Sequence, residues 1–345
     1  MTCSSLLLAA FLAATASADP TVIKFATLAP EGSTWMKVMN DFNKELLEKS
    51  GGKLKFKFYP GGVSGDEKDV VSKMRIGQLH AAGVTGRGLG DVASEVRVMD
   101  APFLFRNTNE IDQVLSKFSK TFDGYLEKAG FVNLGSAEVG LVYTFTNQPI
   151  RATEDMKRTK MWVWEGDPIA EAAFKVLDVH PIPLSLPDVM TSLQTGLIDS
   201  VYGSPMAVVA LQWFTKTKFI YGVPMANASG AILVSKKFLD NLPADSKAVL
   251  LDLGKKYTAK ITDLSRTENT QALTALQKQG LTLTLPSSPD ALEKYEELGR
   301  KARRSLAGRM YPAELLDQVE KAVEEARAGK SVDKKKPKDA KPQKG

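Results

Sequence analysis

Two tryptophans at alternate positions, Trp162 and Trp164, are the residues of this chain with the clearest chemical potential. Alternate residues of a strand point to the same side, so the two indole rings are expected to share one face. Each indole offers a broad apolar surface and a single N–H donor. The side chains expected to extend this surface are Tyr143, Tyr202, Ser204, Met206 and Trp213. The pattern predicts a binding surface for an apolar or aromatic small molecule, unless both tryptophans are ordinary buried strand residues.

Charged residues that could bind the ionic part of a ligand are few. Arg87 follows the predicted strand Ala81–Thr85, at a point where the loops around a cleft emerge. The other arginines that could anchor a carboxylate are Arg97, Arg106 and Arg151. Glu31 and Glu138 are the acidic residues that would suit an amine or a bound cation. For each of these residues the competing interpretation is a solvated surface or turn residue.

Enzymatic chemistry has little support in the sequence. The only histidines, His80 and His180, are far apart and show no metal-ligand spacing. No pattern of a nucleophile, a histidine and an acid is visible. Gly86–Gly90 lacks the full glycine spacing of a nucleotide loop and is interpreted as a turn leading into a helix. We therefore predict a protein that is not an enzyme, with no cofactor and no metal site.

The N-terminal segment has the composition of a secretion signal. Leu6–Ala14 is an apolar run too short to span a bilayer. Ala16-Ser17-Ala18 follows it and has the small side chains that a signal peptidase accepts. Residues 1–18 are thus predicted to be a cleaved signal peptide. The only cysteine, Cys3, lies within this segment, so the mature chain is expected to form no disulfide.

The C-terminal tail accounts for the basic charge of the chain. Residues 330–345 contain seven lysines and two aspartates, which supply +5 of the net charge of +6. The segment 1–18 has no charged side chain, so the body of the protein is close to neutral. We predict that residues 329–345 form a disordered Lys-rich tail, and that nucleic acid is not a partner.

The elements that must position the candidate side chains follow from the hydrophobic periodicity. Strands at residues 21–27, 53–58 and 81–85 alternate with helices in the first part of the chain. The spacing Ser64-x-x-Glu67 predicts a capping box at the start of the second helix. This alternation predicts the α/β fold class, with a parallel-type sheet flanked by helices.

Two extended segments and one long helix divide the chain into two lobes. Residues 131–146 and 218–235 are too long for ordinary strands and are predicted to cross from one sheet into another. Residues 243–280 carry one long helical pattern that spans the hinge. The predicted division is residues 21–143 plus 232–270 in lobe I and residues 144–231 plus 271–328 in lobe II, with a cleft between the lobes.

Several motifs occur in the order typical of one protein family. They are Ala29-Pro30-Glu31-Gly32-Ser33, Tyr59-Pro60-Gly61-Gly62, Ala101-Pro102-Phe103-Leu104-Phe105, Thr153-Glu154-Asp155-Met156-Lys157 and Ser192-Leu193-Gln194-Thr195-Gly196-Leu197-Ile198-Asp199. Over residues 21–327 the chain resembles the extracytoplasmic solute receptors of TRAP transporters, the DctP type. The resemblance implies a two-lobed periplasmic-binding-protein-like (type II) fold. It also implies a periplasmic receptor that captures a small solute in its interlobe cleft and delivers it to TRAP membrane subunits.

The chain departs from this family at the positions that grip the ligand. Most members bind organic acids through an arginine, and the corresponding position here is Trp162. A second arginine found in some sugar-acid receptors is replaced by apolar residues around Leu141-Val142, and Tyr202-Gly203-Ser204-Pro205 replaces an acid-asparagine-proline run. The two-point grip on a carboxylate is therefore missing.

These departures predict a ligand that is largely apolar or aromatic. The predicted ligand-binding residues are Trp162, Trp164, Tyr202, Ser204, Met206, Tyr143, Glu31, Arg87 and Trp213. One alternative is an organic acid held by a relocated cation such as Arg87. Another is a binding protein that serves a sensor or a periplasmic partner protein.

Overall fold

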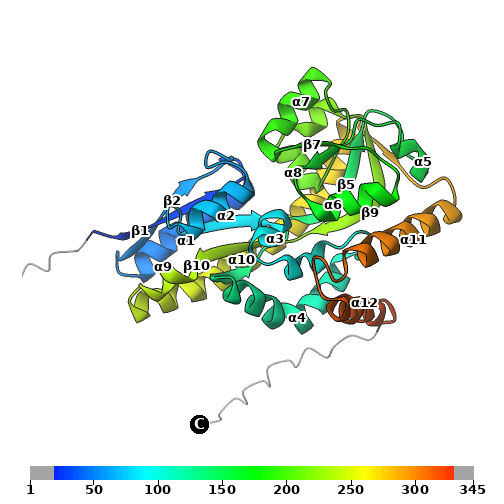
Figure 1. Ribbon diagram of the computed structural model, residues 1–345. Coiled ribbons are helices and arrows are strands. Elements are labelled where there is room, and N and C mark those ends of the chain that lie inside the picture. The colour runs from blue at the N-terminus through cyan, green and yellow to red at the C-terminus, as the bar shows by residue number, and fades with distance from the viewer. Residues whose placement is uncertain (1–18, 330–345) are drawn as a thin grey trace, which may run out of the picture.

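Two sheets, each covered by helices, form the two lobes of the protein (Figure 1). The computed structural model describes residues 19–329. The predicted signal peptide and all but the first residue of the predicted Lys-rich tail lie outside the described residues. No helix within residues 19–329 combines the length and apolarity needed to cross a membrane.

Lobe I is built on a five-stranded sheet in the order β2-β1-β3-β10-β4. Its strands are β1 (Thr21–Thr27), β2 (Leu54–Tyr59), β3 (Ala81–Thr85), β4 (Phe131–Ser136) and β10 (Gly230–Ser235). Its helices are α1 (Thr34–Lys49), α2 (Glu67–Arg75), α3 (Gly86–Val92), the 3-10 helix η1 (Ser94–Asp100), α4 (Thr108–Lys128) and α9 (Lys236–Asp240). Strands β1, β2 and β3 are parallel, whereas β10 runs antiparallel to β3 and β4. The predicted α/β alternation is confirmed.

Lobe II is built on a four-stranded sheet in the order β11-β9-β5-β8 and on the parallel pair β6 and β7. Its strands are β5 (Gly140–Thr146), β6 (Trp162–Trp164), β7 (Ile182–Leu184), β8 (Val201–Gly203), β9 (Phe219–Ala228) and β11 (Thr282–Thr284). Its helices are α5 (Thr153–Met156), α6 (Pro168–Val176), η2 (Leu186–Asp188), α7 (Val189–Thr195), α8 (Pro205–Ala210), η3 (Trp213–Lys216) and α11 (Pro289–Leu306). A bridge between Met161 and Ser200 connects the pair to β8.

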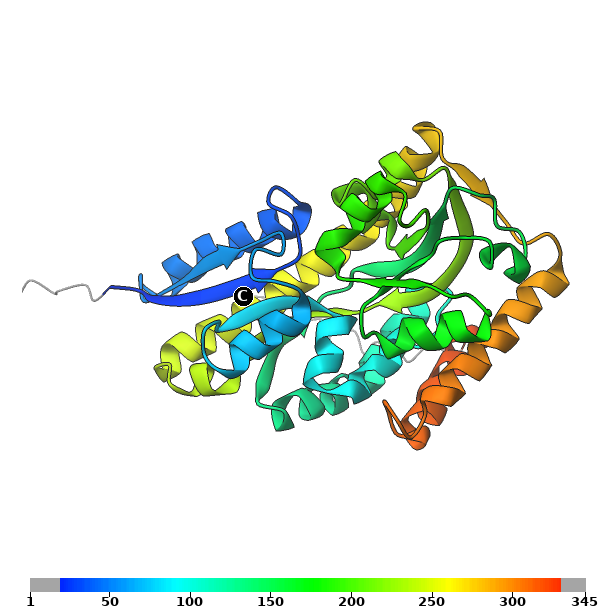
Figure 2. The same cartoon turned by 45° about the horizontal axis from the view of Figure 1, so that its top comes forward.

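The two predicted crossings are present. Strand β4 pairs in the lobe I sheet and β5, three residues later, pairs in the lobe II sheet. Strands β9 and β10 make the return crossing around Ser229. Helix α10 (Ala244–Lys278) packs on α1 and β4 of lobe I and on α8 and β5 of lobe II (Figures 1 and 2). The lobes are therefore joined by two strand crossings and one shared helix.

The last helix differs from the predicted division into lobes. Helix α12 (Ala313–Arg327) falls in the segment 271–328 that the sequence assigned to lobe II, but it packs on α4 of lobe I. Its apolar stripe enters the lobe I core, through Leu315, Leu316, Val319, Ala322 and Val323. The periodicity of a helix defines its apolar face but does not specify which lobe covers that face.

The start of α2 also differs from the prediction. The N-cap is Asp66 and not Ser64, because the Asp66 carboxylate accepts from Glu67 N at 2.7 Å while Asp69 accepts from Asp66 N at 3.0 Å. Glu67 is consequently the first residue of the helix. Its side chain is left free for a different contact, described below.

Candidate ligand-binding site

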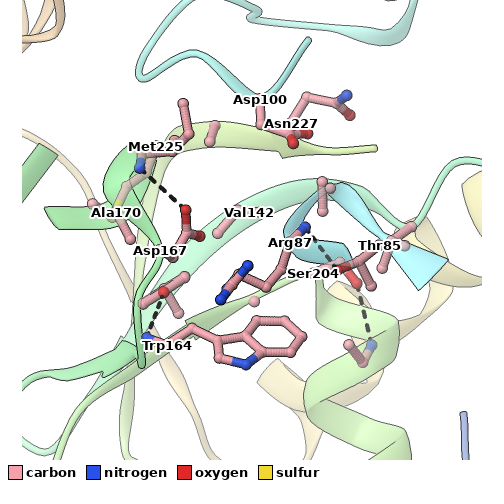
Figure 3. Close-up of a pocket in the computed structure, with 18 of the residues that line it drawn as sticks. Thr85, Arg87, Asp100, Val142, Trp164, Asp167, Ala170, Ser204, Met225 and Asn227 are labelled. Atoms are coloured by element: carbon pink, nitrogen blue, oxygen red, sulfur yellow. Dashed lines mark hydrogen bonds between the residues drawn. The ribbon is translucent and has the colours of Figure 1, made fainter. Parts of the chain in front are cut away.

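A cavity of about 150 Å³ lies between the lobes, and we call it the inner cavity (Figure 3). It is bordered by the ends of β5, β6, β8 and β9 from lobe II and by the start of α3 from lobe I. Aromatic and aliphatic side chains make most of the wall, among them Val142, Trp162, Trp164, Ile169, Phe174, Tyr202, Trp213 and Met225. The cavity is thus placed where closing lobes would enclose a small molecule.

Trp162 lies at the centre of the aromatic wall and is only 1% exposed. Its ring stacks on Tyr202, with centroids 4.8 Å apart and planes at 20°. Trp213 meets the same ring edge-on at 5.3 Å. The indole N–H donates to the carbonyl oxygen of Leu184 at 3.0 Å, so it is already used within the protein. Trp162 therefore supports the cavity wall as a buried apolar ring and offers no free donor.

Trp164 connects the two lobes across the cleft. Its indole N–H donates to Asp66 Oδ2 of lobe I at 2.8 Å, and both side chains are buried. Its backbone N–H donates to the hydroxyl of Tyr202 at 3.1 Å. The same face of β6 that carries Trp162 thus also supplies a contact that holds the lobes together.

Arg87 is placed in the cavity by the start of α3. Glu67 accepts hydrogen bonds from Thr85 N at 2.7 Å, Thr85 Oγ1 at 2.9 Å and Gly88 N at 2.6 Å, which anchors this turn. Burial raises the pKa of Glu67 to about 7 despite these donors. A Cβ at Gly86 would lie 1.8 Å from Asp100 Oδ2, so only glycine fits there. Gly86–Gly90 lies at the start of a helix, as predicted, and its glycines also allow close packing.

The guanidinium of Arg87 has one nitrogen available to a ligand. Nη1 donates to Asp91 Oδ1 at 2.6 Å, and Nε makes a long contact of 3.4 Å with the carbonyl oxygen of Glu165. Within residues 19–329, the side-chain hydrogen bonds of Arg87 use only Nε and Nη1, so Nη2 has no partner. Figure 3 shows the side chain reaching across the pocket beside Trp164. Arg87 can therefore offer an N–H to a ligand without breaking its own ion pair.

A second arginine in the wall is neutralised by two aspartates. Arg97 Nε donates to Asp100 Oδ2 at 2.8 Å, and Nη2 donates to Asp167 Oδ1 at 2.9 Å. All three side chains are buried, and Asp167 belongs to lobe II. Burial alone would lower the pKa of Arg97, but attraction to Asp167 and Asp100 raises it above the ordinary value. This triad joins the lobes and carries a net charge of −1, so Arg97 has no positive charge left for a ligand.

The polar groups left for a ligand are few. The two arginines of the wall, Arg87 and Arg97, are balanced by two aspartates, Asp100 and Asp167. Ser204 caps α8 by accepting from Ala207 N at 3.3 Å, which leaves its hydroxyl hydrogen available. Asn227 donates to the carbonyl oxygen of Met99, while its own Oδ1 is buried without a partner. Burial raises the pKa of Tyr202, so its phenol stays neutral.

The structure brings most of the predicted residues to one place. Those that line the inner cavity are Arg87, Trp162, Trp164, Tyr202, Ser204 and Trp213. Met206 lines a neighbouring opening of about 460 Å³, which we call the outer cleft. Tyr143 lines neither space, because its neighbour Val142 faces the cavity and adjacent strand residues face opposite sides. Glu31 is exposed in the turn before α1 and also lines neither.

The remaining charged candidates are occupied or remote. Arg106 pairs with Glu296 on the surface, and Arg151 is exposed outside both spaces. Glu138 pairs with Arg266 at 2.6 Å and is not in the inner cavity. Arg87 is therefore the relocated cation that the geometry favours among the arginines considered from the sequence.

Some residues of the wall were not predicted from the sequence. Those with polar side chains are Thr85, Asp100, Asp167 and Asn227. Arg97 was considered as a possible carboxylate anchor, with a surface or turn position as the alternative, and its buried ion pairs were not predicted. The pair Asp167-Pro168 carries a usable signal, because aspartate at an N-cap followed by proline marks a helix start. Nothing in the sequence indicated that this helix start would meet Arg97, 70 positions away.

Comparison with known proteins assigns the family. The model of the bacterial extracellular solute-binding proteins, family 7 (DctP), matches residues 25–307, which is most of the chain. The chain belongs to this family. A solute-binding protein of Sulfitobacter sp. (strain NAS-14.1) is 26% identical to this family-7 receptor over 314 residues, covering 90% of this chain and 94% of that protein.

Two further comparisons give the same result for this family-7 receptor. The C4-dicarboxylate-binding periplasmic protein DctP of Rhodobacter capsulatus is 24% identical over 317 residues, covering 91% of this chain and 94% of that protein. The crystal structure of the sugar acid binding protein DctPAm from Advenella mimigardefordensis, in complex with galactonate, matches with a TM-score of 0.83 at 23% identity. That match covers 89% of this chain and 99% of the other, so the two-lobed fold is shared.

Membership in the family confirms the general function expected from the sequence. The protein is a TRAP-type solute receptor of a periplasmic family, and the members of this family bind solutes without catalysing a reaction. Its inner cavity combines the aromatic wall around Trp162 with the available guanidinium nitrogen of Arg87.

Proposed function

We propose that this receptor binds one small organic acid in the inner cavity. The carboxylate contacts Arg87, and a largely apolar or aromatic body packs on the wall around Trp162. The proposal rests on one observation. An apolar wall adjoins a guanidinium nitrogen, Arg87 Nη2, that has no hydrogen-bond partner among residues 19–329. The bound acid is then delivered to TRAP membrane subunits for uptake.

The size of the inner cavity favours a compact group next to the carboxylate. Its volume of about 150 Å³ is close to that of an engineered apolar cavity that holds one benzene molecule. A single ring or a short branched chain therefore fills the space against Trp162 and Phe174. A long polyhydroxylated chain would exceed it.

The polarity of the wall favours one carboxylate over several polar groups. A buried polar group without a hydrogen-bond partner costs roughly 1–3 kcal/mol, so each hydroxyl of a ligand needs its own partner. The inner cavity offers Arg87 Nη2 and the hydroxyls of Ser204 and Tyr202. The relatives above are named for C4-dicarboxylates and sugar acids, which carry more polar groups than this set can satisfy.

A monoacid with an apolar body agrees with both ligand classes that the sequence left open, the apolar or aromatic ligand and the organic acid held by a relocated cation. The apolar wall supports the aromatic ligand, and Arg87 supports the relocated cation. A wholly neutral ligand would leave a guanidinium N–H of Arg87 without a hydrogen-bond acceptor in the closed site, and a charged donor without an acceptor destabilises the complex.

We also propose that residues 1–18 direct the chain to the periplasm and are removed by cleavage after Ala18.

The identity of the ligand class is tested on the receptor purified from its natural host. Native mass spectrometry detects any small molecule retained by the protein, and extraction identifies it. Calorimetry with benzoate, galactonate and succinate then compares the three classes. We expect measurable binding of benzoate only, and tight stoichiometric binding of galactonate or succinate would contradict the apolar part of the proposal.

The role of Arg87 is tested by Arg87→Gln. Loss of a hydrogen bond to a charged group, worth about 1.5–3 kcal/mol, should weaken benzoate binding by about 10- to 100-fold. Arg87→Lys keeps the charge but not the planar donor set, and we expect an intermediate affinity. Arg106→Gln removes a surface arginine outside the cavity and serves as the control. Equal affinities for Arg87→Gln and Arg106→Gln would remove Arg87 from the site.

A further inference from the structure

The outer cleft adjoins the inner cavity and has its own walls. Both spaces are lined by Thr85, Val139, Leu186, Ala207 and Leu211, so they share a border between the lobes. The outer cleft is about three times larger, at about 460 Å³ against 150 Å³. It lies between the start of α1 in lobe I and helices α8 and α10. A ligand anchored at Arg87 can therefore extend across this border.

The walls of the outer cleft are mainly apolar. Its large apolar side chains are Leu28, Trp35, Leu186, Met206, Val209 and Leu211. The indole N–H of Trp35 donates to Ser265 Oγ at 3.1 Å and is not free for a ligand. Two small residues on α10, Ala272 and Ala275, widen the space on the side of the shared helix. Such a surface gains from contact with an alkyl or aryl group.

The charged residues that line the outer cleft are both acidic. Glu67 is buried and accepts three hydrogen bonds from Thr85 and Gly88. Glu268, on α10, accepts from the hydroxyl of Thr34 and is half-buried. Among residues 19–329, no lysine, arginine or histidine lines this cleft. A second carboxylate on a ligand would thus meet Glu268 with no compensating cation in the wall.

We infer that the outer cleft is a second subsite that accepts an uncharged apolar arm of the ligand and rejects a second carboxylate. This inference rests on the proposed function, because it needs the acid group to be anchored at Arg87. The ligand class it specifies is a monoacid with an alkyl or aryl extension. The inner cavity fixes the acid end and the outer cleft selects the length and the charge of the other end.

The test uses the full receptor and two ligand series measured by calorimetry. One series contains straight-chain monoacids from butanoate to decanoate, and the other contains the dicarboxylates of equal chain length. Each added methylene that enters the outer cleft should tighten binding on the order of three- to fourfold. Each dicarboxylate should bind at least about tenfold more weakly than its monoacid partner, and Glu268→Gln should narrow that gap.

Variants that fill the outer cleft test whether the effect of chain length on affinity arises in that cleft. Ala272→Phe places a ring in the wall, and Ala275→Phe, at a more exposed position of the same helix, provides a second variant if the first does not fold. Both should weaken decanoate by at least about tenfold and leave benzoate unchanged. Thr274→Phe lies on the same helix outside the cleft and is the matched control.

The outcomes separate this inference from the proposed function. A rise of affinity with chain length that Ala272→Phe or Ala275→Phe abolishes supports the second subsite. The same affinity along the monoacid series, or equal weakening of benzoate and decanoate, overturns it while the site at Arg87 stands. If the wild-type receptor binds neither benzoate nor any chain acid, the proposed function fails and the second subsite fails with it.

Discussion

Replacing Arg97 with methionine should lower the free energy of unfolding by about 3–5 kcal/mol, because it leaves two buried aspartates without their cation. Arg97 is only 3% exposed, and it contacts Asp100 at 2.8 Å and Asp167 at 2.9 Å. Asp100 lies in lobe I with Arg97, whereas Asp167 lies in lobe II. Urea denaturation followed by circular dichroism measures the change.

The control for this prediction is an arginine of the surface. Arg106→Met removes the pair with Glu296, which is largely exposed, and should cost less than about 1 kcal/mol. The double variant Arg97→Met with Asp167→Asn should recover part of the loss, because one of the two unpaired charges is also removed. A similar loss for Arg97→Met and Arg106→Met would show that the buried triad does not stabilise the fold.

Trp162→Ala should abolish detectable binding of the acid and lower the free energy of unfolding by about 3–5 kcal/mol. Trp162 contacts Tyr202 and Trp213 and forms the centre of the inner cavity wall, so its removal leaves a large void in the core of lobe II. Calorimetry gives the affinity, and urea denaturation gives the stability.

Trp162→Phe separates the loss of binding from the loss of stability. Phenylalanine keeps an aromatic ring against Tyr202 but loses the hydrogen bond to the carbonyl oxygen of Leu184. We expect this variant to fold and to retain most of the affinity for benzoate. If Trp162→Ala folds and binds with unchanged affinity, Trp162 is a packing residue and the proposed site is wrong.

The fold was accessible from the sequence wherever a pattern repeats locally. The alternation of strands and helices, the two long crossings and the hinge-spanning helix all follow from hydrophobic period and length. Even Trp162 and Trp164 could be placed on one face of a strand, since that needs only the twofold period of a strand. The placement of α12 was wrong, because an apolar stripe does not specify which of two cores covers it.

The details of the site depended on contacts between distant residues. Arg97 meets Asp167 only because α6 starts opposite η1 in the folded chain. Tyr143 was predicted in the wall but lines neither space, and the pairing of β5 with β9 shifts register between Val142 and Thr144, which the sequence did not reveal. The capping residue of α2 was missed because Ser64 and Asp66 are both good caps and only the local geometry selects Asp66.

The contact between Trp164 and Asp66 gives the receptor an intrinsic optical label. Of the four tryptophans, Trp162 and Trp213 lie within the lobe II core and Trp35 is bound to Ser265. Trp164 alone donates its indole N–H across the cleft, to a carboxylate that departs when the lobes separate. The polarity and quenching environment of the Trp164 ring therefore change with the distance between the lobes, and the fluorescence of the unlabelled protein reports closure through this ring.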